Sequence, residues 1–299
     1  MKRSILVLPI LLLLAGCGGK NAAVIDDRPV LVVSILPQRY FAARIAGERV
    51  RIMTLVGPGQ EPHNYEPTPK QMADLAAAKV WVLSGTEFEI GLRPKIEAGF
   101  PNLTIIDGTA GVRFRTIEAH DDGDEPGDAI DRHTWLGHEP ARLMAGHIME
   151  ALINMDNIDN IDADSAELYR KNYHDLTADM DREFALLWEQ LAPLRGRVVF
   201  VYHPAFGYFL DEFGIRQEAV ETGGKEPTPR LLAGLIEQAK QEGAKAIFVQ
   251  AQFPVHTAQA VADAAGAVLV PLDPLAPDWL ANIRFMGEVL QRTIGEAGP

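Results

Sequence analysis

Residues 163–193 read ADSAELYRKNYHDLTADMDREFALLWEQLAP, and this long segment sets the organisation of the whole chain. Its apolar residues recur every three or four positions and form one stripe, as in a helix that buries one face. They are Tyr169, Tyr173, Leu176, Met180, Phe184, Leu187 and Leu191. Pro193 ends the pattern, because proline lacks the backbone N–H that a helix needs. At about 1.5 Å per residue the helix would be roughly 40 Å long, which predicts a rigid connector.

Strands and helices alternate on the N-terminal side of this helix. Short apolar, β-branched segments predict four strands, at Val30–Ile35, Arg51–Val56, Lys79–Leu83 and Leu103–Ile106. Thr68-Pro69-Lys70-Gln71 is typical of a helix start, with Thr as the cap, Pro in the first turn and Gln three residues later. Alternation of this kind favours a parallel sheet covered by helices.

The same pattern returns on the C-terminal side. Four more strands are predicted, at Arg197–Tyr202, Ile215–Val220, Ala246–Val249 and Val268–Val270. Thr228-Pro229 opens a predicted helix over Arg230–Gln241, and Glu226-Pro227-Thr228-Pro229 repeats Glu66-Pro67-Thr68-Pro69. We therefore predict an α/β protein with two lobes, residues 30–160 and 194–299, each a mostly parallel sheet flanked by helices. One long rigid helix, residues 161–193, joins the lobes.

The N-terminus has the features of a secretion signal. Lys2 and Arg3 are followed by the apolar segment Ile5–Ala15, which is too short to cross a bilayer. Leu14-Ala15-Gly16-Cys17 resembles the lipobox of bacterial lipoproteins, although an ordinary signal peptide with an incidental cysteine is the alternative. The resemblance implies a signal peptide over residues 1–16, an acylated Cys17, and a lipidated tether over residues 17–29. The protein would then be anchored outside the cytoplasm.

Composition excludes some classes of function. The chain has 299 residues, 47% of them apolar, which is enough to build two cores. The formal net charge of −13 argues against a nucleic-acid partner, because phosphate groups require a basic surface. Cys17 is the only cysteine, which excludes an intrachain disulfide and a CxxC metal site. The acidic segment 118–131 predicts a surface loop.

Four residues are candidate metal ligands. His63, His203 and Asp273 each follow a predicted strand, and ligands of open α/β sheets bind beyond the carboxyl ends of strands. His133 precedes a helix that is predicted over Glu139–Leu152. Three imidazoles and one carboxylate can complete a tetrahedral transition-metal site. The remaining histidines outside the acidic segment are expected to be structural or solvated; they are His138, His147, His174 and His256.

Four motifs around these residues resemble one known family, the zinc- and manganese-binding receptors of ABC importers. The chain has segments that resemble the family patterns Pro-His-x-Tyr-Glu-Pro-Thr, Asp-Pro-His-x-Trp-Leu, His-x-Ala-Phe-x-Tyr-Phe and Leu-Asp-Pro-Leu, in this order. The matching segments are Pro62–Thr68, Asp131–Leu136, His203–Phe209 and Leu272–Leu275. The resemblance runs from about Val30 to the C-terminus.

The resemblance implies a receptor without enzymatic activity. It would bind one metal ion between its lobes through His63, His133, His203 and Asp273, and deliver the ion to the membrane permease of an ABC importer. We expect it to act as a monomer, held at the membrane only by its lipid anchor. Zn²⁺ is the expected cargo, and Mn²⁺ or Fe²⁺ is the alternative, because Asp273 could bind through both oxygens.

The chain departs from the family pattern at several positions. Arg132 replaces the proline of the second motif, Gly137-His138 replaces a usual Asp or Ser, and Gln250 stands where Glu is common. The acidic segment also lacks the histidine-rich loop of many zinc-specific members, which weakens the zinc assignment. Two other functions are less well supported by the sequence. A zinc hydrolase requires an open coordination position and a general base, and the sequence has no HExxH motif. A surface adhesin has no supporting feature in the sequence.

Overall fold

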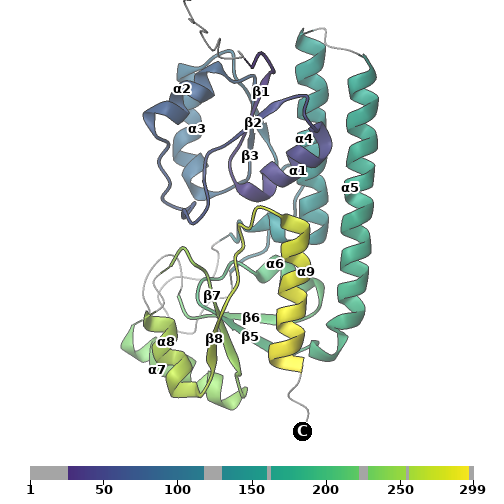
Figure 1. Ribbon diagram of the computed structural model, residues 1–299. Helices are drawn as coiled ribbons and strands as arrows, with labels where there is room; N and C mark the ends of the chain where they lie inside the picture. Colours follow the sequence, from purple (N-terminus) through teal and green to yellow (C-terminus); the bar gives the residue numbers. More distant parts are fainter. Residues whose placement is uncertain (1–25, 118–129, 160–162, 222–227, 254–255, 296–299) are drawn as a thin grey trace, which may run out of the picture.

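The computed structural model describes residues 26–117, 130–159, 163–221, 228–253 and 256–295 (Figure 1). The predicted signal peptide, Cys17 and most of the tether lie outside these residues, as does nearly all of the acidic segment. Within the described residues, no helix combines the length and the apolar composition needed to cross a membrane.

The first lobe is built on a parallel sheet with the strand order β2-β1-β3-β4. Its strands are β1 (Val30–Val33), β2 (Arg51–Thr54), β3 (Val80–Leu83) and β4 (Thr104–Asp107). Its helices are α1 (Leu36–Ala46), α2 (Pro69–Ala77) and α3 (Glu87–Gly99). The central strands β1 and β3 are buried along their whole length, whereas β2 and β4 are partly exposed. Burial on both faces explains why β1 and β3 are continuous apolar runs in the sequence.

The second lobe repeats this topology, with the parallel order β6-β5-β7-β8. Its strands are β5 (Val198–Val201), β6 (Arg216–Ala219), β7 (Ala246–Val249) and β8 (Val268–Pro271). Its helices are α6 (Gly207–Glu212), α7 (Pro229–Gln241), α8 (His256–Ala265) and α9 (Trp279–Leu290). The prediction of two α/β lobes with parallel sheets is confirmed, and every predicted strand is found within two residues at each end.

The two Thr-Pro helix starts are equivalent in the structure. Thr68 caps α2 by accepting a hydrogen bond from the backbone N–H of Gln71, within the expected capping box. Thr228 caps α7 in the same way, through Leu231. Because α2 follows β2 and α7 follows β6, the repeated motif marks the same position in each lobe.

Two long helices, α4 (His138–Asp159) and α5 (Ala163–Gln190), lie side by side against the first lobe, and α5 continues along the second (Figure 1). The predicted long helix is confirmed as α5, which contacts α1 of the first lobe and α9 of the second. The sequence did not predict that α4 packs along it, and α4 extends beyond the predicted Glu139–Leu152. The lobes are therefore joined by the single predicted helix, α5, and α4 packs against it.

One apolar core runs through both lobes, from Val30 of β1 to Ile294 after α9. The stripe on α5 is part of it: Tyr169, Leu176, Met180, Phe184, Leu187 and Leu191 are buried. A smaller core lies between the second sheet, α7 and α8. Because the larger core is shared, moving the lobes apart would expose apolar surface, and this opposes a wide hinge motion.

Candidate metal centre

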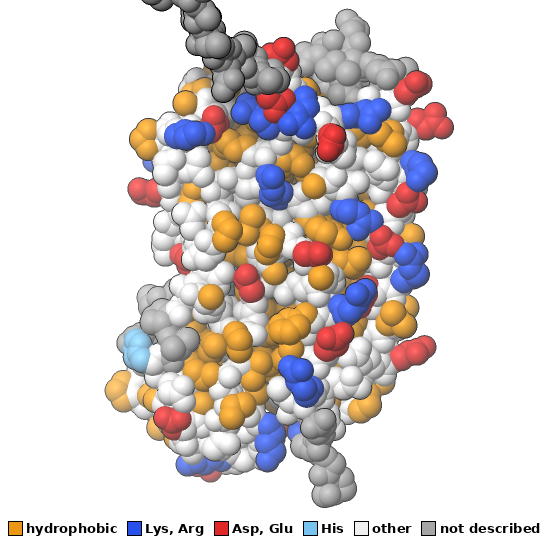
Figure 2. Space-filling model, in the orientation of Figure 1, with side chains coloured by type: hydrophobic (Ala, Val, Ile, Leu, Met, Phe, Trp, Pro, Cys, Tyr) orange, Lys and Arg blue, Asp and Glu red, His pale blue; other side chains and the backbone are white. Residues whose placement is uncertain are grey.

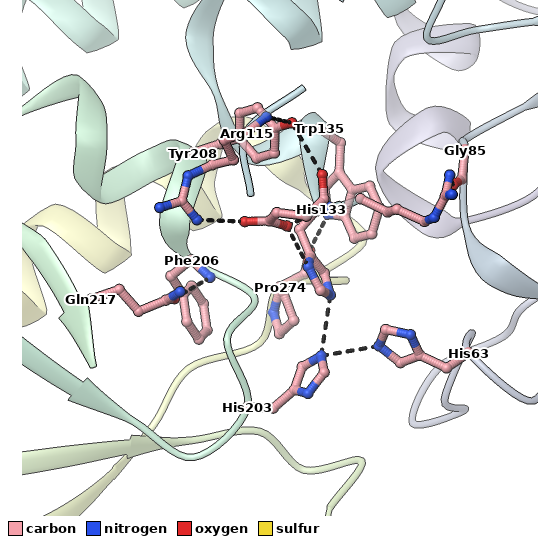
Figure 3. A network of polar contacts seen from close by, with 12 residues as sticks. His63, Gly85, Arg115, His133, Trp135, His203, Phe206, Tyr208, Gln217 and Pro274 are labelled. Atoms are coloured by element: carbon pink, nitrogen blue, oxygen red, sulfur yellow. Dashed lines mark hydrogen bonds and ion pairs between the residues drawn. The ribbon is translucent and has the colours of Figure 1, made fainter. Parts of the chain in front are cut away.

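Three of the four candidate ligands meet at one point between the lobes (Figure 3). The Nε2 atom of His203 lies 3.0 Å from Nε2 of His63 and 3.3 Å from Nε2 of His133. Ligand atoms of all three residues lie within 4.8 Å of one another. Ligands at about 2.0–2.1 Å from a tetrahedral zinc ion are themselves about 3.3 Å apart, so this spacing suits a shared metal ion.

Each imidazole has a carboxylate on its other nitrogen. Nδ1 of His133 lies 2.9 Å from Asp131 Oδ1, and Nδ1 of His203 lies 2.7 Å from Glu221 Oε2. Nδ1 of His63 lies 2.8 Å from Glu87 Oε2. A carboxylate at Nδ1 favours the proton on that nitrogen and leaves the Nε2 lone pair free to bind a metal. All three lone pairs then point to the same position.

His63 is held on a compact loop after β2. Gly59 has a positive φ of 72°, which only glycine adopts without strain, and the backbone N–H of Gly57 donates to the Gln60 side chain. Glu61 Oε1 accepts a hydrogen bond from the backbone N–H of His63. The hydroxyl of Tyr65 donates to Leu55 O at the end of the strand, which closes the loop. The loop therefore fixes the backbone of His63.

His133 lies in the segment that leads to α4. Asp131 accepts hydrogen bonds from both the backbone N–H and Nδ1 of His133, and its side chain is fully buried. The indole N–H of Trp135 donates to Pro274 O at 2.7 Å, and that of Trp279 donates to Trp135 O at 2.6 Å. The His133 segment is thus fastened to the chain that follows β8.

His203 lies two residues after the end of β5. His203 and His133 are both buried, whereas His63 is partly exposed. The Gln250 amide donates to His203 O at 2.9 Å, and Gln250 Oε1 accepts from the His203 N–H at 3.3 Å. A glutamate carboxylate could only accept, so Gln250 satisfies both backbone groups where the family more often has Glu. The ring of Phe253 stacks on the His203 imidazole at 4.6 Å.

The protonation equilibria of His63 and His203 shift in opposite directions. Burial lowers the pKa of His203 to about 4, and although Glu221 opposes this, the neighbouring imidazoles add to it. Burial also lowers the pKa of His63, but Glu87 beside Nδ1 outweighs burial, so the net pKa is raised above the ordinary value. Burial raises the pKa of Asp131, but hydrogen bonds from His133 and Arg115 more than offset it and hold the pKa low.

Asp273 lies outside the group of converging ligand atoms. Its Oδ1 accepts hydrogen bonds from the backbone N–H of Leu275 at 2.9 Å and from Gln252 Nε2 at 3.1 Å. Gln252 and Leu275 nevertheless line a void of about 10 Å³ together with the three histidines. Asp273 therefore contacts two residues that line the site but is not one of the three converging ligands.

A larger cavity of about 380 Å³ adjoins the histidines. Glu61, Glu87 and Arg132 contribute the charged side chains of its wall. Arg132 donates to Gly85 O at 3.1 Å and lies 3.8 Å from Glu87, so this departure from the family pattern ties the His133 segment to the loop before α3. The cavity gives a metal ion space to enter.

The other described histidines lie apart from the site. His138 stacks on Phe184, and its Nε2 lies 2.8 Å from Asp181. His147 contacts Ala110 O. His174 and His256 are exposed. These positions agree with the structural and solvated roles expected from the sequence.

Sequence reasoning did not assign a role to the three carboxylates that face the imidazoles. Asp131 belongs to the motif Asp131–Leu136 and lies two residues before His133. An acidic residue so close to a candidate ligand could have been predicted to orient its imidazole. Glu87 lies 24 residues after His63 in the sequence, and Glu221 lies 18 residues after His203. Only the fold brings them together.

Comparison with known proteins identifies the family. A family model described as zinc-uptake complex component A, periplasmic, matches residues 31–292. The zinc uptake protein ZnuA of Bacillus subtilis is 26% identical over 279 residues, covering 88% of this chain and 85% of that protein. The manganese-binding lipoprotein MntA of Halalkalibacterium halodurans is 25% identical over 255 residues, covering 83% and 80%.

A solved structure gives the same result. A crystal structure of ZnuA is 31% identical, has a TM-score of 0.81, and covers 89% of this chain and 99% of that one. A second ZnuA structure, a deletion mutant with zinc bound, is also 31% identical and has a TM-score of 0.82, with 91% and 100% coverage. The chain belongs to the periplasmic zinc-uptake component A family.

Proposed function

We propose that this protein is an extracytoplasmic receptor that binds one zinc ion and delivers it to the permease of an ABC importer. The single observation that carries the proposal is the convergence of three Nε2 atoms, each from an imidazole with a carboxylate at Nδ1. Imidazoles that are hydrogen-bonded to carboxylates are typical of zinc sites, because the carboxylate fixes the ring and makes Nε2 more basic. Membership of a zinc-uptake family supports the same assignment.

Zinc is preferred over manganese and iron because of the donor atoms. Three nitrogen ligands suit zinc, which accepts four-coordinate sites, whereas manganese favours oxygen ligands and higher coordination. The relatives include both zinc- and manganese-binding proteins, so their names do not separate the metals. Zinc also binds more tightly than manganese at most sites of this kind, so affinity alone is a poor test.

The fourth ligand has two candidates. Asp273 is the residue that the motif Leu272–Leu275 favours, and its carboxylate would have to move towards the three histidines, because its oxygens lie outside the group of converging atoms. Glu61 is the alternative that the structure offers, because its Oε1 lies 3.7 Å from His63 Nε2 and its side chain lines the adjoining cavity. Asp273→Asn should weaken zinc binding if Asp273 is the ligand, and Glu61→Gln should do so if Glu61 is.

A receptor is favoured over a zinc hydrolase. A hydrolase requires a carboxylate or imidazole that is free to act as a general base beside the metal-bound water. Here Asp131, Glu221 and Glu87 each face an imidazole nitrogen, and Glu61 accepts hydrogen bonds from two backbone N–H groups, those of His63 and Asn64. Zinc-dependent cleavage of ester or peptide substrates by the purified protein would support the hydrolase instead.

The anchor is tested separately from the metal site. If Cys17 is acylated, the mature protein fractionates with membranes, and Cys17→Ser releases it or leaves its signal peptide uncleaved. Mass spectrometry of the N-terminal peptide would detect the acyl chains directly. A Cys17→Ser protein that remains membrane-bound with the wild-type mature mass would contradict the lipoprotein assignment.

The decisive experiment for the cargo is anomalous scattering at the zinc and manganese absorption edges, on crystals of protein purified without added metal. We expect one zinc peak between His63, His133 and His203, with the fourth ligand visible in the density. A manganese or iron peak at this position would replace the proposed cargo, and a metal held by other residues would contradict the site.

A further inference from the structure

A network of polar contacts connects His133 to the second lobe through Arg115 (Figure 3). Arg115 precedes the acidic segment, and its backbone O accepts a hydrogen bond from the N–H of Asp131. Its Nη1 lies 2.7 Å from Asp131 Oδ2, and its Nε lies 2.8 Å from Asp211 Oδ2 on α6. One guanidinium therefore bridges the carboxylate that orients His133 and a carboxylate of the other lobe.

Helix α6 holds this guanidinium on a second side. The Tyr208 hydroxyl accepts a hydrogen bond from the backbone N–H of Arg115 at 3.0 Å and donates to Asp131 O at 3.1 Å. The guanidinium also lies 5.9 Å from the centre of the Tyr208 ring. A Cβ at Gly207 would lie 1.7 Å from Arg115 Nη1 and 2.8 Å from Asp131 Oδ2, so only glycine leaves room for the contact.

The contact is well placed to control His133. The Asp131 side chain is completely buried and that of Arg115 is 14% exposed, so their attraction is only weakly screened by solvent. Asp131 uses Oδ2 for Arg115 and Oδ1 for His133, which links the position of the guanidinium to the orientation of the imidazole. Without Arg115, Asp131 would lose the cation that neutralises its buried charge and the hydrogen bond at Oδ2 that helps to fix its carboxylate.

We propose that Arg115 is a positioning residue of the metal site, which ties the orientation of His133 to the placement of α6 in the second lobe. The inference rests on the proposed function, because it assumes that His133 binds the metal. It extends that function by coupling metal affinity to the packing between the lobes.

The first test compares zinc affinities by competition with a chelating dye. Arg115→Ala should weaken binding by about 10–100-fold, as the loss of a hydrogen-bonding partner of a ligand does. Arg115→Lys should restore part of the affinity, because an ammonium group carries the charge but does not bridge two carboxylates as a planar guanidinium does. Arg284→Gln is the matched control, since Arg284 pairs with the buried Glu183 between α9 and α5, outside the metal site.

Gly207→Ala tests the same contact without removing a charge. The new Cβ should displace Arg115 and weaken zinc binding, and it should do less harm in an Arg115→Ala background, where the clash with the guanidinium is gone. The two losses should therefore combine to less than their product. If Arg115→Ala fails to fold, the comparison of Gly207→Ala with wild type and with Arg115→Lys still decides the question.

The visible absorption bands of bound Co²⁺ separate positioning from simple destabilisation, because they report ligand geometry. The bands should change in Arg115→Ala and Gly207→Ala but not in Arg284→Gln. The inference is overturned if both variants bind zinc within about twofold of wild type, or if their losses combine independently. If the wild type itself binds no zinc in the same titration, the proposed function fails instead.

Discussion

In the first lobe, the loop after the outer strand β2 carries a converging imidazole, His63, whereas in the second lobe the chain after the equivalent strand β6 begins with a carboxylate, Glu221. The second lobe places its imidazole, His203, after the inner strand β5 instead. The same strand order therefore supplies an imidazole in one lobe and the carboxylate that orients an imidazole in the other. Equivalent positions in a repeated fold need not carry equivalent chemistry.

The two lobes also differ in how tightly they hold their imidazole. The side chain of His203 is 6% exposed and that of its partner Glu221 is 3% exposed. The corresponding fractions for His63 and Glu87 are 23% and 38%. The second lobe thus offers a rigid, preorganised ligand, and the first lobe offers a ligand at the mouth of the adjoining cavity. We expect the metal to meet His63 as it enters and to be held by His203 and His133.

Removal of an imidazole from each lobe tests this comparison most strongly. His203→Ala, His133→Ala and His63→Ala should each weaken zinc binding by more than about 100-fold, the upper range for loss of a ligand's hydrogen-bonding partner. His203→Ala should be worse than His63→Ala, because water can reach and replace the more exposed ligand. Competition titration measures both losses, and a larger loss for His63→Ala would contradict the expectation that the more deeply buried imidazole contributes more to binding.

The carboxylates at Nδ1 should show the same order with smaller effects. Glu221→Gln should weaken zinc binding by about 10–100-fold, and Glu87→Gln by less, because solvent already competes for the exposed Glu87. Asp181→Asn is the matched control, since Asp181 faces His138 in the same manner but outside the metal site. Equal losses for Glu87→Gln and Asp181→Asn would show that Glu87 does not orient His63.

The pH dependence of binding should also distinguish the lobes. An imidazole must be neutral to bind a metal, so a proton competes with zinc below the pKa of each imidazole. The pKa of His63 is raised above that of an ordinary histidine, and that of His203 is lowered to about 4. Zinc affinity should therefore fall by about tenfold per pH unit as the pH drops through the His63 pKa, while His203 stays neutral until about pH 4.

NMR titration of the histidine ring nitrogens in metal-free protein checks this assignment. The His63 resonance should move at a higher pH than the His203 resonance. The opposite order, or a common midpoint, would show that the difference in exposure does not control the two equilibria.

The smallest expected effect is that of His138. Its ring packs on Phe184 and contacts Asp181, so His138→Ala should change zinc affinity by no more than about twofold while lowering the melting temperature. Titration and thermal denaturation of one sample measure both quantities. A strong loss of zinc affinity with normal stability would place His138 in the metal site and break the comparison between the lobes.

Much of the fold could be predicted from the sequence because the relevant signals are local. The stripe on α5, the caps Thr68 and Thr228, and the apolar run of β1 each depend on residues a few positions apart. The packing of α4 along α5 was missed, because a helix with an apolar face does not specify which partner covers that face. The sequence predicted a helix at both positions, but it did not predict that α4 and α5 pack against each other.

The site, like the fold, was predicted only in part from the sequence. The sequence by itself pointed to His63, His133 and His203, because each lies at a chain position where a strand or helix begins or ends and within a recognisable motif. Only the tertiary structure set Asp273 apart from them, turned its Oδ1 toward Gln252 and Leu275, and brought Glu87, Glu221 and Arg115 into contact with the imidazoles or their partners. The physical reason is that residue type and spacing fix which groups are available for chemistry, whereas the distances between groups from remote segments depend on how the lobes and α6 pack.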